Sequence, residues 1–344
     1  MIYLNLLIIF LIIIFIHEFG HYSIARYFKI KVTDFSIGFG KSIYNFIDKN
    51  NTNWKISMIP LGGYVKIKGL ESIFQNPQNT NEERDSFQSL HLFKKICILL
   101  AGSFFNIFSA WLCLFCLLFF FGIASFSPEI GKVLDNSSAS INDLREGDII
   151  TRINDRDIKT FSDIATSIRN SQTINIDIIR GNEIISKEFN LTYNKGIGKY
   201  MIGISSTNNP IISKFATWLS LKQSFLFIPN YYLETVKYLS RSYKNNTLSQ
   251  ELAGPIGIVK MADQLMLDKL RGAFFLFIVI SLFVGIFNLL PIPLLDGGHI
   301  IYFSLRSFFS NSLPSFVTRI YLAIGITIIS FLFIIITFND IFYK

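Results

Sequence analysis

Four long apolar stretches dominate the pattern of this 344-residue chain. They cover about residues 2–26, 97–122, 273–290 and 318–338, and most of the polar residues lie between them. Each stretch approaches the roughly 20 residues that a helix needs to cross a bilayer. The pattern therefore predicts a polytopic α-helical membrane protein with about four transmembrane helices.

Between the second and third apolar stretches, residues 128–206 regain charge and alternate β-branched runs with turns. "EIGKVLD", "GDIITRIND", "QTINIDIIRGN" and "ISKEFNLTY" predict strands, and "FSDIATSIRN" predicts a short helix capped by Ser162. The order of these elements resembles a PDZ domain, most clearly in "LREGDIITRINDRDIKTFSDI". Asp143-Leu144 and Arg156 depart from the usual glycines of that pattern, so the sequence supports the PDZ fold more than ligand binding by its groove. A small β-rich spacer is the alternative.

Residues 212–250 carry apolar side chains at three- and four-residue spacing, interrupted by Pro229. This spacing predicts two amphipathic helices on the membrane surface or against the bundle. A fifth span is disfavoured because Lys222, Glu234 and Lys237 interrupt the apolar character. We expect four parts: a first half of the membrane core (1–122), a PDZ-like β domain (123–210), amphipathic helices (211–272) and a second half of the core (273–344).

Composition supports a membrane protein and excludes other classes. Hydrophobic residues make up 51% of the chain and charged residues only 16%, against about a quarter in soluble domains. The net charge is +8, but lysines and arginines form no dense stripe, which argues against nucleic acid and suits anionic lipid headgroups. The three cysteines, Cys97, Cys113 and Cys116, lie too close together in apolar sequence to predict a disulfide framework.

The basic residues that flank the first two apolar stretches predict the orientation. Arg26, Lys29 and Lys31 follow the first stretch, and Lys94 and Lys95 precede the second. The positive-inside rule then places residues 27–96 on the cytoplasmic side. The PDZ-like domain and both termini are expected on the other, periplasmic side of the membrane.

A metal-ligand pattern stands at the end of the first apolar stretch. His17 and His21 are four residues apart, so a helix presents both imidazoles on one face. In the H-E-x-x-H pattern two such histidines hold zinc, and the intervening glutamate, here Glu18, acts as general base. Ionisable residues inside membrane helices are costly, which makes a chance occurrence here less common. The plain alternative is a solvated helix end or a satisfied histidine pair.

A catalytic zinc ion usually takes a third protein ligand. His91 lies in a charged loop and suits an interfacial position better. A better source is "FNLLPIPLLDGGHI", residues 287–300, in which two prolines break an apolar run before Asp296 and His299. Broken helices are tolerated at membrane depth where they line protein or a cavity. Spacing alone does not choose between Asp296 and His299.

His17-Glu18-x-x-His21, followed near the other end of the chain by Leu295-Asp296-Gly297, resembles the site-2 protease family of intramembrane zinc metalloproteases. Further segments are similar to the bacterial regulators of sigma-E proteases within that family: "FSIGFGK", "IPLGGYVKIKG", "AGSFFN", "LAGPIGIVK" and "FNLLPIPLLDGGH". The resemblance implies that Asp296 is the third zinc ligand and that Glu18 is the catalytic base.

The same resemblance implies how substrate is held. It makes "WKISMIPLGGYVKI" a membrane-reentrant β-hairpin, with Gly62 and Gly63 at its bend. Independently, Trp54, Ile56 and Met58 alternate with Lys55 and Ser57, which predicts a strand, and an edge strand over residues 54–67 would pair with an extended substrate segment. The resemblance implies that substrate contacts come from Gly62, Gly63, Tyr64, Asn106, Asn288, Pro291 and Pro293. Buried hydrogen bonding is the alternative role for the two asparagines.

The function expected from this resemblance is zinc-dependent cleavage within transmembrane segments at the bacterial inner membrane. Its partners would be the bilayer and single-span membrane proteins, such as anti-sigma factor-like proteins or remnant signal peptides. Sigma-E regulators of this type commonly carry two PDZ domains, whereas this chain has room for one. The competing readings are a noncatalytic scaffold that binds partners through the PDZ-like domain, and a zinc transporter.

Overall fold

The computed structural model describes residues 2–70, 83–168, 172–194, 199–207, 210–213, 217–244, 269–309 and 314–342. The chain forms two compact units. One contains residues 1–117 together with 220–344, and the other contains residues 118–219. The segment "LAGPIGIVK", residues 252–260, lies outside the described residues.

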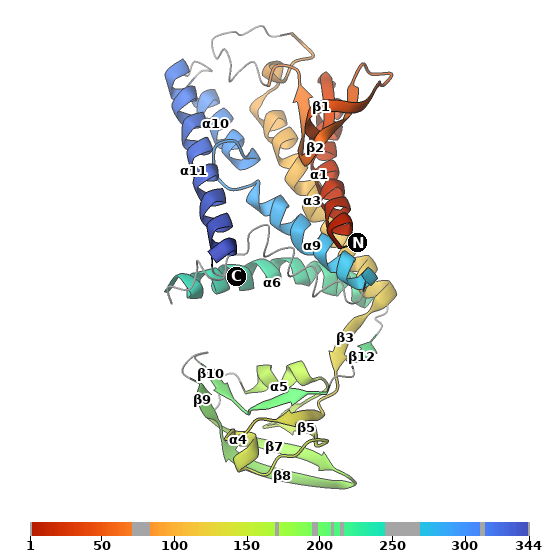
Figure 1. Ribbon diagram of the computed structural model, residues 1–344, viewed down its shortest axis with the longest axis vertical. Helices are drawn as coiled ribbons and strands as arrows, with labels where there is room; N and C mark the ends of the chain where they lie inside the picture. The colour runs from red at the N-terminus through yellow and green to blue at the C-terminus, as the bar shows by residue number, and fades with distance from the viewer. Residues whose placement is uncertain are drawn as a thin grey trace. The chain divides into compact units, whose positions relative to one another are not determined.

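The larger unit is a bundle of apolar helices (Figure 1). Its long helices are α1 (Ile2–Tyr27), α3 (Leu92–Cys116), α9 (Lys269–Phe287) and α11 (Ser315–Phe342), and α10 (Asp296–Phe308) is shorter. Within the described residues, four helices are long and apolar enough to cross a membrane: Leu4–Tyr27, Leu92–Phe121, Leu270–Phe287 and Ser315–Asn339. The predicted number and approximate places of the long apolar helices are therefore confirmed.

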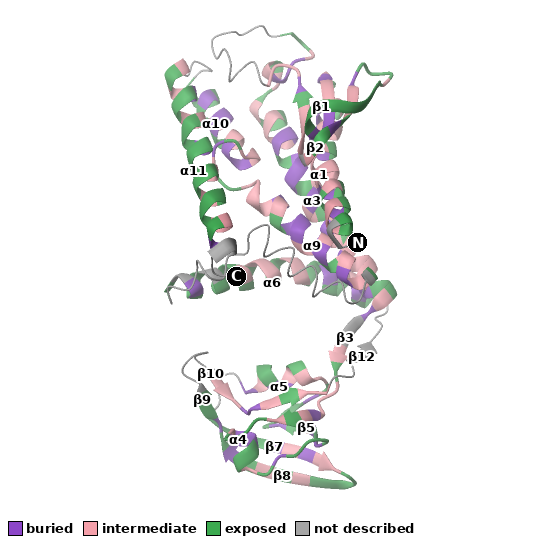
Figure 2. Ribbon diagram, viewed as in Figure 1, coloured by how far each residue is buried: buried purple, intermediate pink, exposed green. Residues whose placement is uncertain are grey.

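Burial follows the contacts among these helices. α1, α3 and α9 contact one another, and α3 also contacts α10. Buried positions lie where these helices face each other, whereas α11 is exposed along most of its length (Figure 2). A helix that is apolar all round and exposed in this way is suited to contact with lipid.

A curled β-sheet lies against α1 in the same unit. Strands β1 (Val32–Ile47) and β2 (Asn53–Ile67) are long and bent, so each takes part in more than one ladder. Phe35 pairs with Trp54 and with Val65, and Trp54 also pairs with Phe46. The strand order is therefore 42–47, 53–57, 32–37 and 63–67.

This order corrects the predicted edge strand. Residues 53–56 are paired on both sides, so they offer no free edge. The 63–67 part of β2, by contrast, pairs with β1 on one side, and no second pairing is recorded for it among the described residues. Both strands bend where glycines adopt positive φ: Gly38 and Gly40 in β1, at +88° and +85°, and Gly62 in β2, at +130°.

Aromatic side chains attach this sheet to α1. Phe35 stacks on Trp54 with ring centroids 4.3 Å apart, and Tyr22 of α1 meets Trp54 edge-on at 5.1 Å. Phe15 of α1 meets Phe35 at 5.6 Å. Such pairs add to the free energy gained from apolar burial. The contacts fix the sheet at the level of the H-E-x-x-H segment.

The smaller unit is a β domain with two short helices. Its main sheet has the order β6-β5-β7-β8 and is antiparallel. The elements are β3 (Ile123–Phe126), β4 (Ile130–Val133), α4 (Ser138–Ile141), β5 (Ile149–Ile153), β6 (Arg156–Asp157), α5 (Phe161–Ser167), β7 (Thr173–Arg180), β8 (Glu183–Asn190), β9 (Thr192–Asn194), β10 (Lys199–Met201), β11 (Ile204–Ser206) and β12 (Pro210–Ser213). The four predicted strands and the predicted helix are present.

The predicted helix cap is wrong by two residues. α5 is capped by Thr160 and not by Ser162, which lies inside the helix. The backbone N–H of Thr160 donates to the Asp163 carboxylate at 2.8 Å, which completes a capping box. The sequence signal for the correct cap is Asp163, because an acidic residue three positions after Thr160 can complete a capping box.

A buried ion pair fixes β7 to the loop before β5. Arg180 donates to Asp148 through Nε at 2.7 Å and through Nη2 at 2.8 Å, and the Asp148 side chain is only 1% exposed. Burial raises the pKa of the Asp148 carboxyl, but hydrogen bonds from Arg180 and from the Arg145 backbone lower it by more. The pKa of Asp148 therefore lies below its usual value. The pair therefore contributes stability at neutral pH that is lost only in acid, as pH falls through that lowered pKa.

Residues 217–244 form one helix, α6 (Thr217–Lys244), where two were predicted. Pro229 lies inside it and removes one backbone donor. Both halves are nevertheless held by the bundle: Phe225 contacts Trp111 of α3 with ring centroids 4.8 Å apart, and the Tyr232 hydroxyl donates to the Leu282 carbonyl of α9 at 3.1 Å. Tertiary packing on either side of the proline keeps the helix continuous.

Candidate active site

Helix α1 supplies the first part of the site. His17 and His21 lie one turn apart, and their ring centroids are 4.8 Å apart. Glycines let α3 approach this face of α1. A Cβ atom at Gly20 would lie 2.8 Å from the carbonyl carbon of Ala101, and one at Gly102 would lie 2.7 Å from Cε1 of His17. No side chain larger than hydrogen fits at either position without a shift of the neighbouring atoms.

The second part comes from the broken segment between α9 and α10. The Gly297 N–H donates to the Asn288 carbonyl at 2.7 Å, which folds the segment back on itself. A Cβ at Gly297 would lie 2.6 Å from the Leu290 oxygen, and one at Gly298 would lie 2.6 Å from the Ile292 carbonyl carbon. The two glycines therefore let α10 begin directly against the segment, with Asp296 in its first turn.

These elements bring three ligand atoms together. Nε2 of His17 and Nε2 of His21 are 3.2 Å apart, and Oδ2 of Asp296 lies 3.4 Å from the first and 3.5 Å from the second. The side chains are only 12%, 10% and 14% exposed. The structure thus places Asp296, and not His299, in the triangle, while His91 accepts a hydrogen bond from the Phe93 N–H as the cap of α3.

The triangle fits a zinc ion. Tetrahedral zinc with bonds of about 2.0–2.1 Å separates its ligand atoms by about 3.3 Å, close to the three observed distances. Oδ2 of Asp296 is buried and accepts no hydrogen bond from the described residues. A buried carboxylate oxygen directed at two imidazole nitrogens is the donor set that zinc uses, so these residues fit the metal.

Each imidazole has a partner on α3 for its other nitrogen. Nδ1–H of His21 donates to the Ile98 carbonyl at 2.8 Å, which leaves Nε2 free for a metal. Nδ1 of His17 lies 3.2 Å from the side-chain amide of Asn106. Such contacts orient the ring of a ligating histidine.

A cavity of about 310 Å³ opens beside the triangle. Glu18 lines it, half-buried, with its carboxylate next to the backbone N–H of Val65. Of the substrate-contact residues predicted from the sequence, Gly63, Tyr64 and Asn288 line the cavity, whereas Gly62, Asn106, Pro291 and Pro293 do not. Pro293 is buried instead, and a Cβ at Gly325 of α11 would lie 2.6 Å from its Cβ.

Several lining residues were not predicted individually as site residues. They are Val65, Ile67, Leu70, Ile98, Leu99 and Leu294. Val65 and Ile67 could have been predicted from Gly63, because residues two apart in a strand lie on the same face. Ile98 and Leu99 are apolar positions in an apolar helix, so no local pattern separates them from lipid-facing neighbours. Substrate contact at any of these residues stays a prediction.

The site and its surroundings define a class of protein. Two histidines on one helical face, a buried carboxylate completing their triangle, and a glutamate beside them form a metallohydrolase centre. Its ligands come from helices α1 and α10 inside an apolar bundle that contains four candidate membrane spans. The fold and the site together are those of a membrane metalloprotease.

The profile of peptidase family M50 matches residues 5–332, and the chain belongs to that family. It is a metalloendopeptidase of the site-2 protease type, and thus an intramembrane protease. A relative from Rickettsia conorii is 34% identical over 350 residues, which cover 96% of this chain and 95% of the relative. A relative from Campylobacter jejuni is 33% identical and covers 96% and 90%. The names of both describe zinc metalloproteases.

A solved structure resembles part of the chain. It is the PDZ domain of an SdrC-like protein from Listeria monocytogenes, which is 24% identical. The likeness covers 24% of this chain and 90% of that domain, with a TM-score of 0.22.

We expect Gly102→Ala to disable the site. The added methyl would lie 2.7 Å from Cε1 of His17 and 2.8 Å from Cε1 of His21, so both rings must move. A displacement of about 1 Å in a catalytic group can reduce activity about 100-fold. Peptidase assays and zinc analysis of the purified full chain measure the loss.

Gly285→Ala is the matched control for Gly102→Ala. It adds the same methyl group between α9 and α3, where the nearest atoms belong to Ile107 at 2.9 Å, Ser103 at 3.1 Å and Asn106 at 3.4 Å, and none belongs to an imidazole. This variant should keep its zinc and most of its activity. Equal losses in the two variants would show that helix packing, and not contact with the imidazoles, governs the effect.

Proposed function

We propose that this protein is a zinc-dependent endopeptidase that cleaves the transmembrane segments of single-span membrane proteins already trimmed outside the membrane. Anti-sigma factor-like proteins and remnant signal peptides are the substrates of this kind. The observation that carries the proposal is the zinc-sized triangle of His17, His21 and Asp296 beside Glu18, in a cavity also lined by the outer strand of the β1–β2 sheet, residues 63–67. A substrate backbone held along that strand would lie next to the catalytic groups.

The chemistry divides between the metal and the chain. Zinc at such a site supplies Lewis acidity, which polarises a peptide carbonyl and makes a water molecule more acidic. Glu18 lines the same cavity and is absent from the ligand triangle, so its carboxylate is available to accept a proton from the attacking water. It would then deliver that proton to the leaving amide nitrogen.

The edge strand addresses a problem specific to helical substrates. A peptide in an intact helix has its carbonyls engaged in internal hydrogen bonds, so the segment must unwind before hydrolysis. Residues 63–67 pair with β1 on one side, and no second strand of the described residues pairs with them on the other; Gly63, Tyr64 and Val65 line the cavity. Backbone pairing along this edge would replace the lost helical hydrogen bonds without requiring a particular sequence.

The part of the β1–β2 sheet formed by residues 39–47 and 56–59 supports a membrane-reentrant position for the sheet. Large apolar side chains there are exposed: Phe39, Ile43, Tyr44, Phe46, Ile47, Ile56, Met58 and Ile59. A patch of this size on a soluble surface would be unusual. Together with the basic residues that flank α1 and α3, it favours an inner-membrane protein with residues 27–96 on the cytoplasmic side and the β domain and termini in the periplasm.

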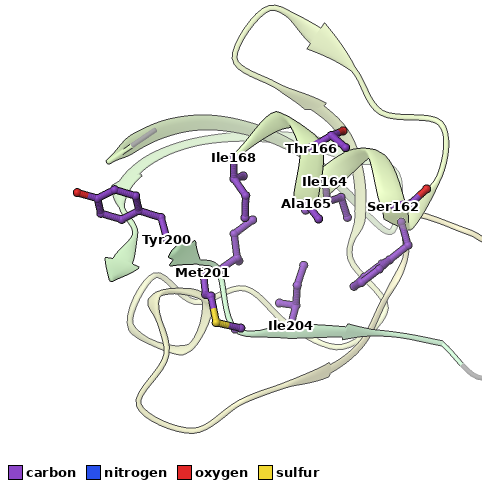
Figure 3. Close-up of a pocket in the computed structure, with 11 residues that line it drawn as sticks. Ser162, Ile164, Ala165, Thr166, Ile168, Tyr200, Met201 and Ile204 are labelled. Carbon is purple, nitrogen blue, oxygen red and sulfur yellow. The ribbon is translucent and has the colours of Figure 1, made fainter. Parts of the chain in front are cut away.

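The β domain offers a place for the end of a trimmed substrate. A groove of about 350 Å³ lies between α5 and residues 200–204 (Figure 3). It is lined by Phe161, Ser162, Ile164, Ala165, Thr166, Ile168, Tyr200, Met201, Ile202, Gly203 and Ile204. None of these is charged, and in the described residues β11 pairs on one side only, with β4. An extended apolar segment exposed by trimming suits such a groove.

Glu18→Gln tests the enzymatic claim. The amide keeps the shape of the side chain but accepts no proton, so cleavage should fall at least about 100-fold. Zinc content should stay at the wild-type level, because Glu18 is not in the ligand triangle. The measurement is reconstituted cleavage of a single-span protein, with zinc quantified on the same sample.

Two controls accompany the Glu18→Gln measurement. Glu83→Gln changes a largely exposed carboxylate that pairs with Lys68, and its activity should match wild type. A zinc chelator should abolish cleavage by wild type. Wild-type rates in the Glu18→Gln protein would contradict the proposed function, because the cleavage would then not depend on the proposed base and a contaminating protease would explain it.

Ala165→Glu tests the groove. Ala165 lines it and is exposed, so a charge there should disturb ligand docking without unfolding the domain. Cleavage of a trimmed substrate should show a KM raised about tenfold, with kcat unchanged, since loss of uniform binding has that effect. Ser167→Glu adds the same charge to α5 outside the groove and is the control. Identical kinetics in the two variants would rule out docking by the groove.

A further inference from the structure

The place of Asn106 in the structure fits the alternative role given to it from the sequence, buried hydrogen bonding. Its side chain is fully buried on α3, and it does not line the cavity that Glu18 and Asp296 share. Its amide lies 3.2 Å from Nδ1 of His17, the ring nitrogen that points away from the ligand triangle. Asn288, by contrast, lines the cavity.

The backbone of Asn106 is fixed between two helices. Its carbonyl accepts hydrogen bonds from the Ser109 hydroxyl at 2.9 Å and from the buried Ser281 hydroxyl of α9 at 3.0 Å. The two hydroxyls are 3.3 Å apart. This anchoring joins α3 to α9 at Asn106 and holds its side chain against His17.

The contact has a chemical consequence for His17. A histidine that ligates through Nε2 carries its proton on Nδ1, and that N–H requires an acceptor. The amide has two orientations that differ by a half-turn. In the structure its NH2 group faces Nδ1, and Oδ1 has no donor among the described residues. After the half-turn, Oδ1 accepts the Nδ1–H of His17.

The two histidines are held differently. His21 donates to a main-chain carbonyl, that of Ile98, which every residue at position 98 would supply. The only side-chain partner that the described residues give Nδ1 of His17 is Asn106. The orientation of one ligand therefore depends on a single replaceable side chain.

We propose that Asn106 is a positioning residue of the metal site: its amide oxygen accepts the Nδ1–H of His17 and thereby fixes the ring so that Nε2 points at the metal. The inference rests on the proposed zinc site and adds a role for a residue that the family resemblance placed at the substrate. Partners of this kind typically change metal affinity 10- to 100-fold when removed.

The test compares three variants of the full chain in detergent. Asn106→Leu keeps the size of the side chain but has no acceptor, and its zinc affinity should be about 10- to 100-fold weaker in competition with a chelator. Asn106→Asp keeps an acceptor oxygen in place, and it should restore affinity close to wild type. Asn288→Leu should leave zinc affinity unchanged while raising KM for substrate.

A second readout guards against simple misfolding. Cobalt in place of zinc gives absorption bands that report the ligand geometry, and these should change in Asn106→Leu but not in Asn106→Asp. Wild-type zinc affinity in Asn106→Leu would overturn the inference, and so would equal weakening in Asn106→Leu and Asn106→Asp. If the wild-type protein bound no zinc, the proposed zinc-dependent function would be wrong. If the wild type bound zinc and Asn106→Leu bound it equally well, only the role of Asn106 would be wrong.

Discussion

The close approach of α3 to α1 is the contact on which the rest of the structure depends. Gly20 and Gly102 leave no side chain between the two helices at the level of His17 and His21. Because of this approach, α3 supplies the polar partners of both imidazoles, from Ile98 and Asn106. In an apolar bundle those partners are necessary, since an unsatisfied ring N–H would be costly to bury.

The need to bring Asp296 to the two buried imidazoles explains the irregular backbone between α9 and α10. Asp296 must reach the imidazoles from a helix at the far end of the sequence, so α9 ends early and the chain folds back before α10. Glycines at positions 297 and 298 permit that fold, and Gly325 of α11 accommodates Pro293 against it. Irregular backbone at membrane depth is acceptable here because it is packed against protein and lines the cavity.

Much of this architecture could be predicted from the sequence, and the limits have physical causes. The four spans, the β domain and the pairing of His17 with His21 follow from local periodicity. The choice of Asp296 over His299 needed either the family resemblance or the structure, because the backbone turn at Gly297 sets it. The double pairing of Trp54, the continuity of α6 through Pro229 and the contact of Asn106 with His17 depend on tertiary packing, which no local pattern encodes.

The central claim is that two imidazoles and one carboxylate from opposite ends of the chain hold a single zinc ion. X-ray absorption at the zinc edge of the purified full chain tests it most directly. The expected spectrum shows one zinc per chain with two imidazole nitrogens at about 2.0–2.1 Å, oxygen in the remaining positions and no sulfur, and Asp296→Ala should lose an oxygen ligand or the metal. A sulfur ligand at about 2.3 Å, or an Asp296→Ala spectrum identical to wild type, would contradict the account.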